Sequence, residues 1–433
     1  MRYIVLFTLK NTIFVALLLA TAVAASKPRY EVVIDAGSSG TRLYFWKITD
    51  PVLPQTVRLI EPIITNFERD KDENGIDDWV CTPSIAPATV NTQVIGPLLD
   101  KLDIKTLPAG VTIKEITVSV LATAGMRTAA VRCGQLKVDQ LYTLIKNYIK
   151  SRTFLVGDVR TTDGNKEEGI WTWLNLNYVK DRLKAGDTTF GDLEVGGSSA
   201  QIVFQVARLQ ADPANNIYPV TFNGKTWYVF SKSYLGLGQD DARKYIRTTA
   251  NPEVCWTKGL LAANDAGEKG STSKLLLDGN YDYGTCTSLY DAYLTQTITD
   301  NGGAPPTHES QGPLIGVDAA FYAASYFDAS PNDDPVLLTN EIPLRCADVL
   351  LMPGVQDPLN DQTQRQCNLG TFVNSMMFGT NGLFRTGSNK VTLTMSNDVK
   401  DNLNNKVRVI TWTRGYLLSK IYVPLVKSRE ERR

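Results

Sequence analysis

Residues 30–48 read YEVVIDAGSSGTRLYFWKI, and residues 192–204 follow the same plan in DLEVGGSSAQIVF. In each stretch an apolar, β-rich run reaches an acidic residue, Asp35 or Glu194, passes through a Gly/Ser turn and resumes as a second apolar run. This pattern is typical of a β-hairpin with a polar tip. One copy alone fits a tight turn stabilised by local hydrogen bonds as well as it fits a ligand-binding loop. Two matching copies favour a shared chemical task.

The residues at the two tips suit an anion. Small side chains let backbone N–H groups converge on a phosphate, and hydroxyls add further donors. The acid at the end of each strand would repel a bare phosphate, so it fits this task only if a divalent cation lies between them. The predicted phosphate-binding residues are Ser38, Ser39, Gly40 and Thr41 in the first hairpin and Gly196, Gly197, Ser198 and Ser199 in the second.

This duplicated hairpin resembles the phosphate loops of the actin, Hsp70 and sugar kinase superfamily. The resemblance implies an α/β fold with two actin/Hsp70-like (RNase H-like) lobes and a nucleotide cleft between them. A chain of 433 residues is also too long for one ordinary core. We expect residues 27–162 together with 405–433 to form lobe I, and residues 163–404 to form lobe II.

The N-terminus and the charge balance bear on location and partners. Residues 1–25 combine a short basic head, an apolar run and small residues before Ser26, which predicts a signal peptide. A retained anchor is the weaker alternative, because the apolar run is shorter than the ~20 residues of a spanning helix. The 45 basic and 45 acidic residues give no cationic surface for nucleic acid. We therefore expect a secreted or periplasmic monomer, without a stable membrane anchor, that binds a small molecule.

All six cysteines follow the predicted signal peptide, and an even count in an exported chain favours three disulfides without fixing their pairing. His308 is the single histidine, which disfavours a histidine metal site and a Ser-His-Asp triad. No Asn-x-Ser/Thr sequon occurs, which favours a bacterial exported protein. Residues 68–79 are densely charged but lack EF-hand spacing, so we expect a solvated loop there.

Two segments between the hairpins carry further candidates. Residues 116–127 predict a buried strand whose end, at Thr123, would reach an open α/β cleft. Residues 164–179 predict a helix with Glu167 and Glu168 in its first turn. The two acids are compatible with a simple interaction with the helix dipole, but in a cleft without a histidine one of them is the best available general base. The buried stripe of this helix is expected to comprise Trp171, Leu174 and Tyr178.

Five ordered motifs make the resemblance more specific. They are IDAGSSGTR (34–42), LATAGMR (121–127), GNKEEGIWTWLNLNY (164–178), DLEVGGSSAQIVF (192–204) and SYLGLGQDDAR (233–243). Their order and approximate spacing are those of the apyrase conserved regions, and VITWTRGYLL (409–418) fits the corresponding C-terminal segment. Five motifs in order are far more specific than any one of them. The chain therefore resembles the apyrase/CD39 family of nucleoside triphosphate diphosphohydrolases over nearly all of its length.

The resemblance implies a role for each matching residue. Glu168 is the general base, and Gly169 is expected to leave room for substrate beside it. Asp35 and Glu194 hold Ca²⁺ or Mg²⁺ largely through its water shell, while Arg42 belongs to the first phosphate loop. The residues that position the attacking water and the terminal phosphate are Thr123, Ser199 and Gln201, and those expected near the base are Gln239 and Tyr322. The expected disulfides are Cys255–Cys286 and Cys346–Cys367, with Cys81–Cys133 as the remaining pair.

The expected reaction is metal-dependent hydrolysis of nucleoside tri- and diphosphates to monophosphate and phosphate, without a covalent intermediate. The chain departs from the family where Glu194 replaces a frequent Asp, where Leu237 replaces a frequent Tyr near base and ribose, and in having no C-terminal transmembrane helix, which implies a soluble form. The alternatives are a sugar kinase, an exopolyphosphatase-like hydrolase and a non-catalytic exported nucleotide-binding protein. Export to a compartment poor in ATP argues against the kinase, and the intact catalytic residues argue against the non-catalytic protein.

Overall fold

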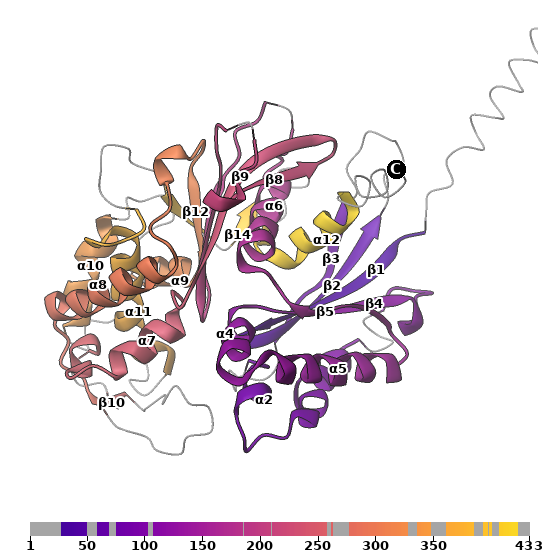
Figure 1. Ribbon diagram of the computed structural model, residues 1–433, viewed down its shortest axis with the longest axis horizontal. Helices are drawn as coiled ribbons and strands as arrows, with labels where there is room; N and C mark the ends of the chain where they lie inside the picture. The colour runs from indigo at the N-terminus through magenta and orange to yellow at the C-terminus, as the bar shows by residue number, and fades with distance from the viewer. Residues whose placement is uncertain are drawn as a thin grey trace, which may run out of the picture.

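The computed structural model describes residues 27–49, 59–68, 75–102, 107–184, 186–208, 210–257, 261–262, 277–327, 336–347, 361–384, 393–396, 398–400 and 407–422. The predicted signal peptide, residues 1–25, lies outside these described residues. Within them, two main β-sheets stand apart, with helices between them and on their outer faces (Figure 1). The chain is therefore a mixed α/β protein built from two lobes.

The first sheet is built on the first hairpin. Its strand order is β3 (Leu59–Glu68), β2 (Gly40–Thr49), β1 (Arg29–Gly37), β4 (Ile116–Ala122) and β5 (Leu155–Thr161). Strands β1 and β2 are antiparallel, whereas β4 runs parallel to β1 and β5 parallel to β4. Strand β1 is buried along nearly its whole length, as its continuous apolar run predicts for a central strand covered on both faces. The predicted hairpin and the predicted strand that ends at Thr123 are both confirmed.

The second sheet repeats this plan around the second hairpin. Its strand order is β13 (Leu393–Met395), β12 (Leu314–Asp318), β6 (Gly191–Val195), β7 (Ser199–Gln205), β9 (Lys225–Leu235) and β8 (Ile217–Phe222). The antiparallel pair β6–β7 takes the place of β1–β2, and β12 runs parallel to β6 as β4 runs parallel to β1. The repeated order confirms two related α/β lobes, each organised around one hairpin.

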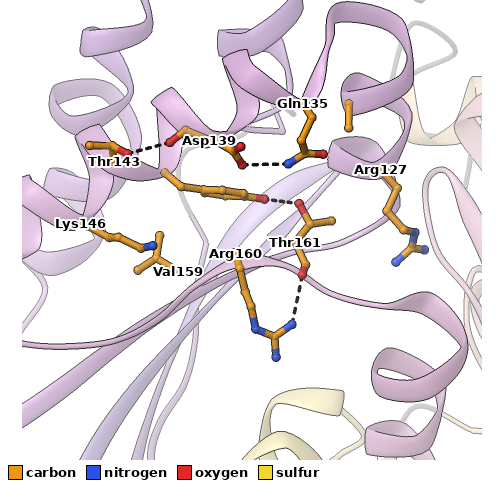
Figure 2. A pocket seen from close by; sticks show the side chains of 10 residues that line it. Arg127, Gln135, Asp139, Thr143, Lys146, Val159, Arg160 and Thr161 are labelled. Carbon is orange, nitrogen blue, oxygen red and sulfur yellow. Dashed lines mark hydrogen bonds between the residues drawn. The ribbon is translucent and has the colours of Figure 1, made fainter.

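Helices cover the outer faces and fill the space between the sheets (Figure 1). Those packed with the first sheet are α2 (Asp78–Cys81), α3 (Gly96–Leu99), α4 (Ala124–Cys133) and α5 (Gln135–Ser151). Those packed with the second are α7 (Gln239–Arg247), α8 (Tyr283–Asp300), α9 (Ala319–Tyr326), α10 (Val336–Cys346) and α11 (Asp361–Phe378). Helices α6 (Gly169–Val179) and α12 (Trp412–Tyr422) lie between the sheets, in a core that takes side chains from both. A cavity of about 590 Å³ opens between α4, α5 and β5 (Figure 2).

Helix α6 is buried on all sides, since every one of its residues is buried. The predicted stripe was too narrow, because this helix lies between two sheets rather than on one. Helix α12 packs against it, with the ring centroids of Trp171 and Tyr416 5.1 Å apart. The Tyr416 hydroxyl donates to Asp158 Oδ2 at 2.9 Å and lies 3.0 Å from Ser119 Oγ, both from the first sheet. The two helices therefore hold the lobes in one packed unit.

Three disulfides reinforce the lobes: Cys81–Cys133, Cys255–Cys286 and Cys346–Cys367. The predicted pairing is confirmed, and no cysteine of the described chain is free. The first disulfide links α2 to α4, and the third links α10 to α11. No helix among the described residues is both long enough and apolar enough to cross a membrane.

The charged segment over residues 68–79 differs from the expected solvated loop in its second half. Residues 69–74 lie outside the described part of the chain, but Ile76, Asp78 and Trp79 are buried. Gly75 lies so close to the first hairpin that a methyl group on it would be 2.6 Å from the carbonyl oxygen of Ser38. This half of the segment is therefore packed against the first hairpin turn, and the expectation is wrong for it.

Candidate active site

The tips of the two hairpins meet between the lobes. The second tip is closed by a hydrogen bond from Gly196 N to Ser199 O at 2.9 Å. Gly197 lies so close to the first tip that a methyl group on it would be 2.5 Å from Ser38 Oγ and 3.3 Å from Ser39 Cβ. Two loops far apart in the sequence thus form one surface of small side chains, hydroxyls and backbone N–H groups.

The acids of the two hairpins occupy equivalent positions in their strand pairs, with Asp35 opposite Arg42 and Glu194 opposite Gln201. Both acids are buried. Burial raises the pKa of Asp35 to about 7, although the charge of Arg42 opposes this shift. Burial also raises the pKa of Glu194 well above its usual range. The charge of Glu168 raises the pKa of both acids further, so the carboxylates share one region.

Another acid, the half-buried Asp318, lies beside them. It ends β12, where it is in register with Val195, the residue after Glu194. After burial, its charge is the strongest influence that raises the pKa of Glu194. The sequence does not single out Asp318, because β12 is a short apolar strand with no glycine turn after it. The available signal is its place at the carboxyl end of a parallel strand, where open α/β sheets bind ligands.

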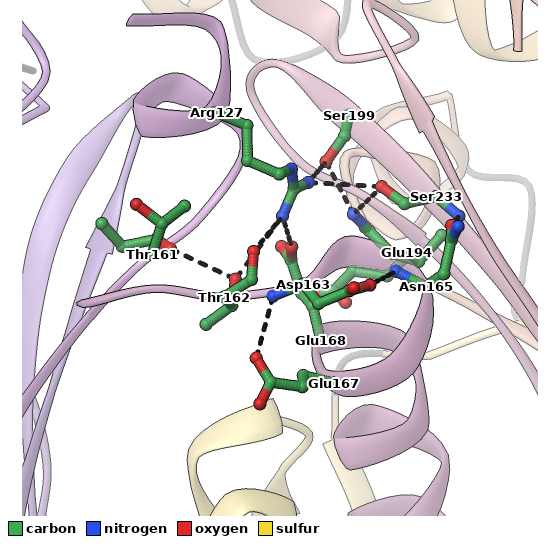
Figure 3. Close-up of polar contacts among 12 residues, drawn as sticks. Arg127, Thr161, Thr162, Asp163, Asn165, Glu167, Glu168, Glu194, Ser199 and Ser233 are labelled. Carbon is green, nitrogen blue, oxygen red and sulfur yellow. Dashed lines mark hydrogen bonds and ion pairs between the residues drawn. The ribbon is translucent and has the colours of Figure 1, made fainter. Parts of the chain in front are cut away.

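Glu168 is held by Arg127 at the centre of the site (Figure 3). Arg127 Nη1 donates to Glu168 Oε2 at 2.7 Å, and these side chains are only 18% and 6% exposed. Arg127 Nη2 donates to the hydroxyls of Ser199 at 3.3 Å and Ser233 at 3.2 Å. Gln201 Nε2 donates to the same hydroxyls at 2.6 and 3.1 Å. One network therefore joins three of the residues that the sequence predicts to be catalytic: Glu168, Ser199 and Gln201.

Arg127 and Ser233 are central to this network, yet the sequence does not single them out. Both lie inside the quoted motifs, but a lone arginine in a helix and a lone serine in a strand are common in any fold. Only an indirect argument could have pointed to them. A glutamate buried away from water requires a cation or several hydrogen-bond donors beside it. Ser233 is itself positioned by its backbone N–H, which donates to Asn165 Oδ1 at 2.7 Å.

Glu167 points away from its neighbour and pairs with a different arginine. Arg160 donates to its two carboxylate oxygens at 2.6 and 2.7 Å, and Asp163 N donates to Oε2 at 2.8 Å. These contacts hold the π-helical turn η4 (Gly164–Glu168) that precedes α6. Adjacent helical residues are turned about 100° apart, so the two glutamates face different partners (Figure 3).

The expectation that Gly169 leaves room for substrate is wrong. A methyl group on Gly169 would lie 2.7 Å from Val203 Cγ2 and 2.9 Å from Ser231 Oγ. The missing side chain therefore lets α6 pack closely against β7 and β9. On the next turn, Thr172 Oγ1 donates to Glu194 Oε2 at 3.0 Å, which connects α6 to the acid of the second hairpin.

The remaining predicted residues lie at the edges of the site. Thr123 N donates to the carbonyl of Ala36 at 3.3 Å, beside the first tip. Gln239 begins α7, and its backbone N–H donates to the carbonyl of the second tip at 2.9 Å. Leu237 is fully buried in the core of the second lobe, so its side chain does not reach a base or ribose. Tyr322 lies on α9 and is 56% exposed.

The clustered acids of the site favour a positive charge beside them. Among the described residues, no three histidine, cysteine or acidic side chains converge closely enough to ligate a metal ion. Asp35 Oδ1 is nevertheless buried without a hydrogen-bond partner, and Glu194 and Asp318 repel each other nearby. A positive charge would relieve both problems, and Mg²⁺ in particular gives up its water reluctantly.

Comparison with known proteins gives a consistent result. The GDA1/CD39 (nucleoside phosphatase) family matches residues 22–421. Human ectonucleoside triphosphate diphosphohydrolase 6 is 30% identical over 239 residues, which are 52% of this chain and 44% of that protein. The Golgi apyrase of Schizosaccharomyces pombe is 32% identical over 265 residues, 56% of this chain and 42% of that protein. The chain thus matches less than half the length of these curated relatives.

A solved structure has a similar fold. The crystal structure of nucleoside triphosphate hydrolases from Neospora caninum superposes with a TM-score of 0.61 at 16% identity. The superposition covers 96% of each chain. At this identity the likeness concerns the fold alone, and it supports the two-lobe architecture.

Proposed function

Because the chain belongs to the GDA1/CD39 (nucleoside phosphatase) family, we propose that it hydrolyses nucleoside tri- and diphosphates to the monophosphate and phosphate. The observation that carries the proposal is the network of Glu168, Arg127, Ser199 and Gln201 directly beside two facing hairpin tips. Backbone N–H groups and hydroxyls at the tips supply donors for a polyphosphate. The network supplies a carboxylate at the point where a terminal phosphate would end.

The proposed role of Glu168 is that of general base. Its carboxylate takes a proton from a water molecule, which attacks the terminal phosphorus in line with the departing oxygen. The hydroxyl of Ser199 and the amide of Gln201 orient that water, and Thr123 bounds its pocket beside the first tip. Arg127 fixes the direction of the Glu168 carboxylate and lies where charge develops on the phosphoryl oxygens. No covalent intermediate is needed.

We further propose that Asp35 and Glu194 hold Ca²⁺ or Mg²⁺ through its water shell, with Asp318 as an additional acid. The buried, partnerless Oδ1 of Asp35 and the mutual repulsion of Glu194 and Asp318 support this assignment. When bound, the cation neutralises charge on the phosphate oxygens. The phosphates themselves are assigned to the two tips, from Ser38 to Arg42 and from Gly196 to Ser199.

The proposal also covers the residues that contact the nucleobase and the compartment in which the protein acts. Gln239 abuts the second tip, and exposed Tyr322 offers a ring on the same lobe, so we assign them to the ribose and base. Three disulfides are typical of an oxidising compartment, which supports a secreted or periplasmic location. We expect the protein to act as a monomer, and sedimentation of the purified chain tests this.

The decisive experiment measures phosphate release and the binding of a non-hydrolysable ATP analogue. The panel includes nucleoside tri- and diphosphates, inorganic polyphosphate and a metal-free control. Glu168→Gln preserves the shape of the side chain but cannot accept a proton, so hydrolysis should fall roughly 10²- to 10⁴-fold while analogue binding survives. Glu167→Gln is the matched control, since Glu167 pairs with Arg160 outside the network, and it should lose far less.

Three outcomes would contradict the proposal. If both variants hydrolyse ATP within a few fold of the parent, the acid pair only stabilises the helix and the base lies elsewhere. If polyphosphate is hydrolysed and nucleotides are not, the exopolyphosphatase alternative is correct. If nucleotides bind without phosphate release in the presence of divalent cations, the protein is a non-catalytic binder.

A further inference from the structure

Ser233 lies on β9 within the polar network, although the proposed mechanism gives it no role (Figure 3). In the second sheet it is in register with Gln201 of β7, which is in turn in register with Glu194 of β6. Side chains in register on neighbouring strands share one face of a sheet, so these three form a row. Thr172 of α6 donates to Glu194 at 3.0 Å. The row therefore faces α6 and the turn η4 that precedes it.

The hydroxyl of Ser233 completes a closed set of four hydrogen bonds. It accepts from Arg127 Nη2 at 3.2 Å and from Gln201 Nε2 at 3.1 Å. The hydroxyl of Ser199 accepts from the same two nitrogens at 3.3 and 2.6 Å. Each of these nitrogens carries two N–H groups, and each hydroxyl oxygen has two acceptor positions. The two serines thus offer one acceptor position to each of the four N–H groups.

This arrangement decides how Arg127 holds the proposed general base, Glu168. Arg127 Nη1 donates to Glu168 Oε2 at 2.7 Å, and no hydrogen bond from any residue that the structure describes reaches Oε1. Arginine binds a carboxylate most strongly when two N–H groups meet its two oxygens. Because the two serines hold Nη2, Arg127 contacts a single oxygen of Glu168. The other oxygen therefore remains available to accept a proton.

The main chain of Ser233 is fixed to the turn η4. Its backbone N–H donates to Asn165 Oδ1 at 2.7 Å, and the hydroxyl of Ser231, two residues earlier on β9, donates to the Asn165 carbonyl at 2.5 Å. Gly164 packs so closely that a methyl group on it would lie 2.6 Å from Ser233 Oγ and 3.0 Å from Arg127 Cζ. Ser233 thus has little freedom to move relative to η4, as is required of a residue that orients others.

We propose that Ser233 is a positioning residue of the hydrolytic site. Its hydroxyl holds Arg127 Nη2 and the Gln201 amide, and so keeps Arg127 on one oxygen of Glu168. Without this acceptor, one N–H of Nη2 loses its partner and can turn to the second oxygen of the carboxylate that Nη1 already binds. A carboxylate held at both oxygens accepts a proton from water less readily. This inference rests on the proposed role of Glu168 in hydrolysis.

Phosphate release from ATP with Mg²⁺ and binding of the non-hydrolysable ATP analogue test the role of Ser233. Ser233→Ala should lower kcat roughly 10- to 100-fold, the scale of a small misplacement of catalytic groups, while KM and analogue binding change little. Ser231→Ala is the matched control. It removes a hydroxyl that lies on the same strand face and binds the same turn, but that does not contact Arg127 or Gln201. Its kcat should stay within a few fold of the parent.

A double variant separates positioning from a purely structural effect. In a chain that already carries Glu168→Gln, no carboxylate remains to be positioned, so adding Ser233→Ala should lower the rate only slightly. The role of Ser233 is overturned if Ser233→Ala behaves like Ser231→Ala, if it abolishes analogue binding, or if it lowers the rate by the same factor in both backgrounds. If Glu168→Gln hydrolyses ATP as fast as the parent, the proposed general base itself fails, and the role of Ser233 falls with it.

Discussion

The two hairpin tips share a strand plan and a turn, but they differ in the residue opposite the acid. In the first lobe Asp35 lies opposite Arg42, and in the second Glu194 lies opposite Gln201. Arg42 lowers the pKa of Asp35 against the effect of burial, so that it reaches about 7. For Glu194, only the hydrogen bond from the Thr172 hydroxyl lowers the pKa, whereas burial and the charges of its acidic neighbours raise it.

This difference separates two ways to keep an acid in a dry cleft. The first tip carries part of its own compensation, because an arginine is built into the partner strand. The second tip holds an acid whose partner residue, Gln201, is neutral and donates its amide N–H groups to the hydroxyls of Ser199 and Ser233. The second acid therefore depends more strongly on a cation supplied from solution. The asymmetry gives the duplicated lobes distinct roles within the proposed site.

The largest effect should follow from removing either acid. Asp35→Ala and Glu194→Ala should raise the divalent concentration needed for half-maximal activity by roughly 10- to 100-fold, the range found for groups that act on a metal through its outer shell. Glu194→Ala should have the greater effect, because Arg42 already shares the charge of Asp35. Titration of activity with Mg²⁺ and with Ca²⁺ measures both.

Glu31→Gln is the control for this prediction. Glu31 is another buried acid of β1, but it lies near the opposite end of the strand from the hairpin tip. Its substitution should leave the metal requirement unchanged. An unaltered requirement in both acid variants would remove the basis for a water-mediated metal site, and a greater effect at Asp35 would reverse the comparison of the tips.

The sequence predicts the hairpins well because their signal is local. Alternating and apolar runs around Gly/Ser turns define the strands, and an acid precedes the turn in each copy. Asp318 lacks such a signal, since its importance arises from the pairing of β12 with β6 across more than a hundred residues of intervening chain. The sequence of a short apolar strand does not indicate which other strand it will pair with. A residue placed by long-range pairing alone is therefore found only in the folded structure.

The packing around Glu168 was harder to predict than its separation from Glu167. Helical geometry separates Glu167 from Glu168, and the structure gives them different partners, Arg160 and Arg127. The role of Gly169 was misjudged because a sequence motif does not show which face of a helix meets a sheet. Its missing side chain serves the contact between α6 and β7. The general lesson is that motifs locate reactive groups, whereas close packing decides what surrounds them.

An intermediate effect should follow from crowding the place where the tips meet. Gly197→Ala would put a methyl group 2.5 Å from Ser38 Oγ and 2.6 Å from Asp240 Oδ2, so these side chains must turn away or the tips must move apart. Such overpacking typically costs about 1–3 kcal/mol, and we expect a loss of unfolding free energy in that range with weaker analogue binding. Urea denaturation and calorimetry measure the two effects.

Gly196→Ala provides a matched control one residue away. Its methyl group would meet only the Ser199 carbonyl oxygen, at an ordinary contact distance of 3.5 Å. Its unfolding free energy should therefore change by no more than a few tenths of a kcal/mol, the usual scale of a substitution that strains nothing. Equal losses in the two variants would show that the tips do not touch in solution, and the convergence of the lobes would have to be abandoned.

The smallest effect concerns Asp241, which lies behind the second tip. Burial raises its pKa to about 7, the charges of Asp240 and Asp77 raise it further, and a hydrogen bond from Ser198 opposes the shift. The folded chain therefore keeps the proton up to about pH 7, whereas the unfolded chain releases it near its ordinary pKa of 3.8. Between these values the folded state binds more protons, so stability falls as the pH rises.

Between pH 6 and 7 the contribution of Asp241 should be at most about 1 kcal/mol, because a full pKa unit is worth about 1.4 kcal/mol and solvent near its edge screens part of that. Asp241→Asn should remove this contribution to the slope of unfolding free energy against pH. Urea denaturation at each pH, without divalent cations, measures that slope. The other buried acids of the site act in the same direction, so the difference between parent and variant isolates Asp241.

Asp77→Asn sharpens the comparison, because Asp77 belongs to the segment packed against the first tip. If the tips meet as described, its removal should lower the pKa of Asp241 and reduce the slope in part, whereas an unchanged slope would mean that no charge of the first lobe reaches the second.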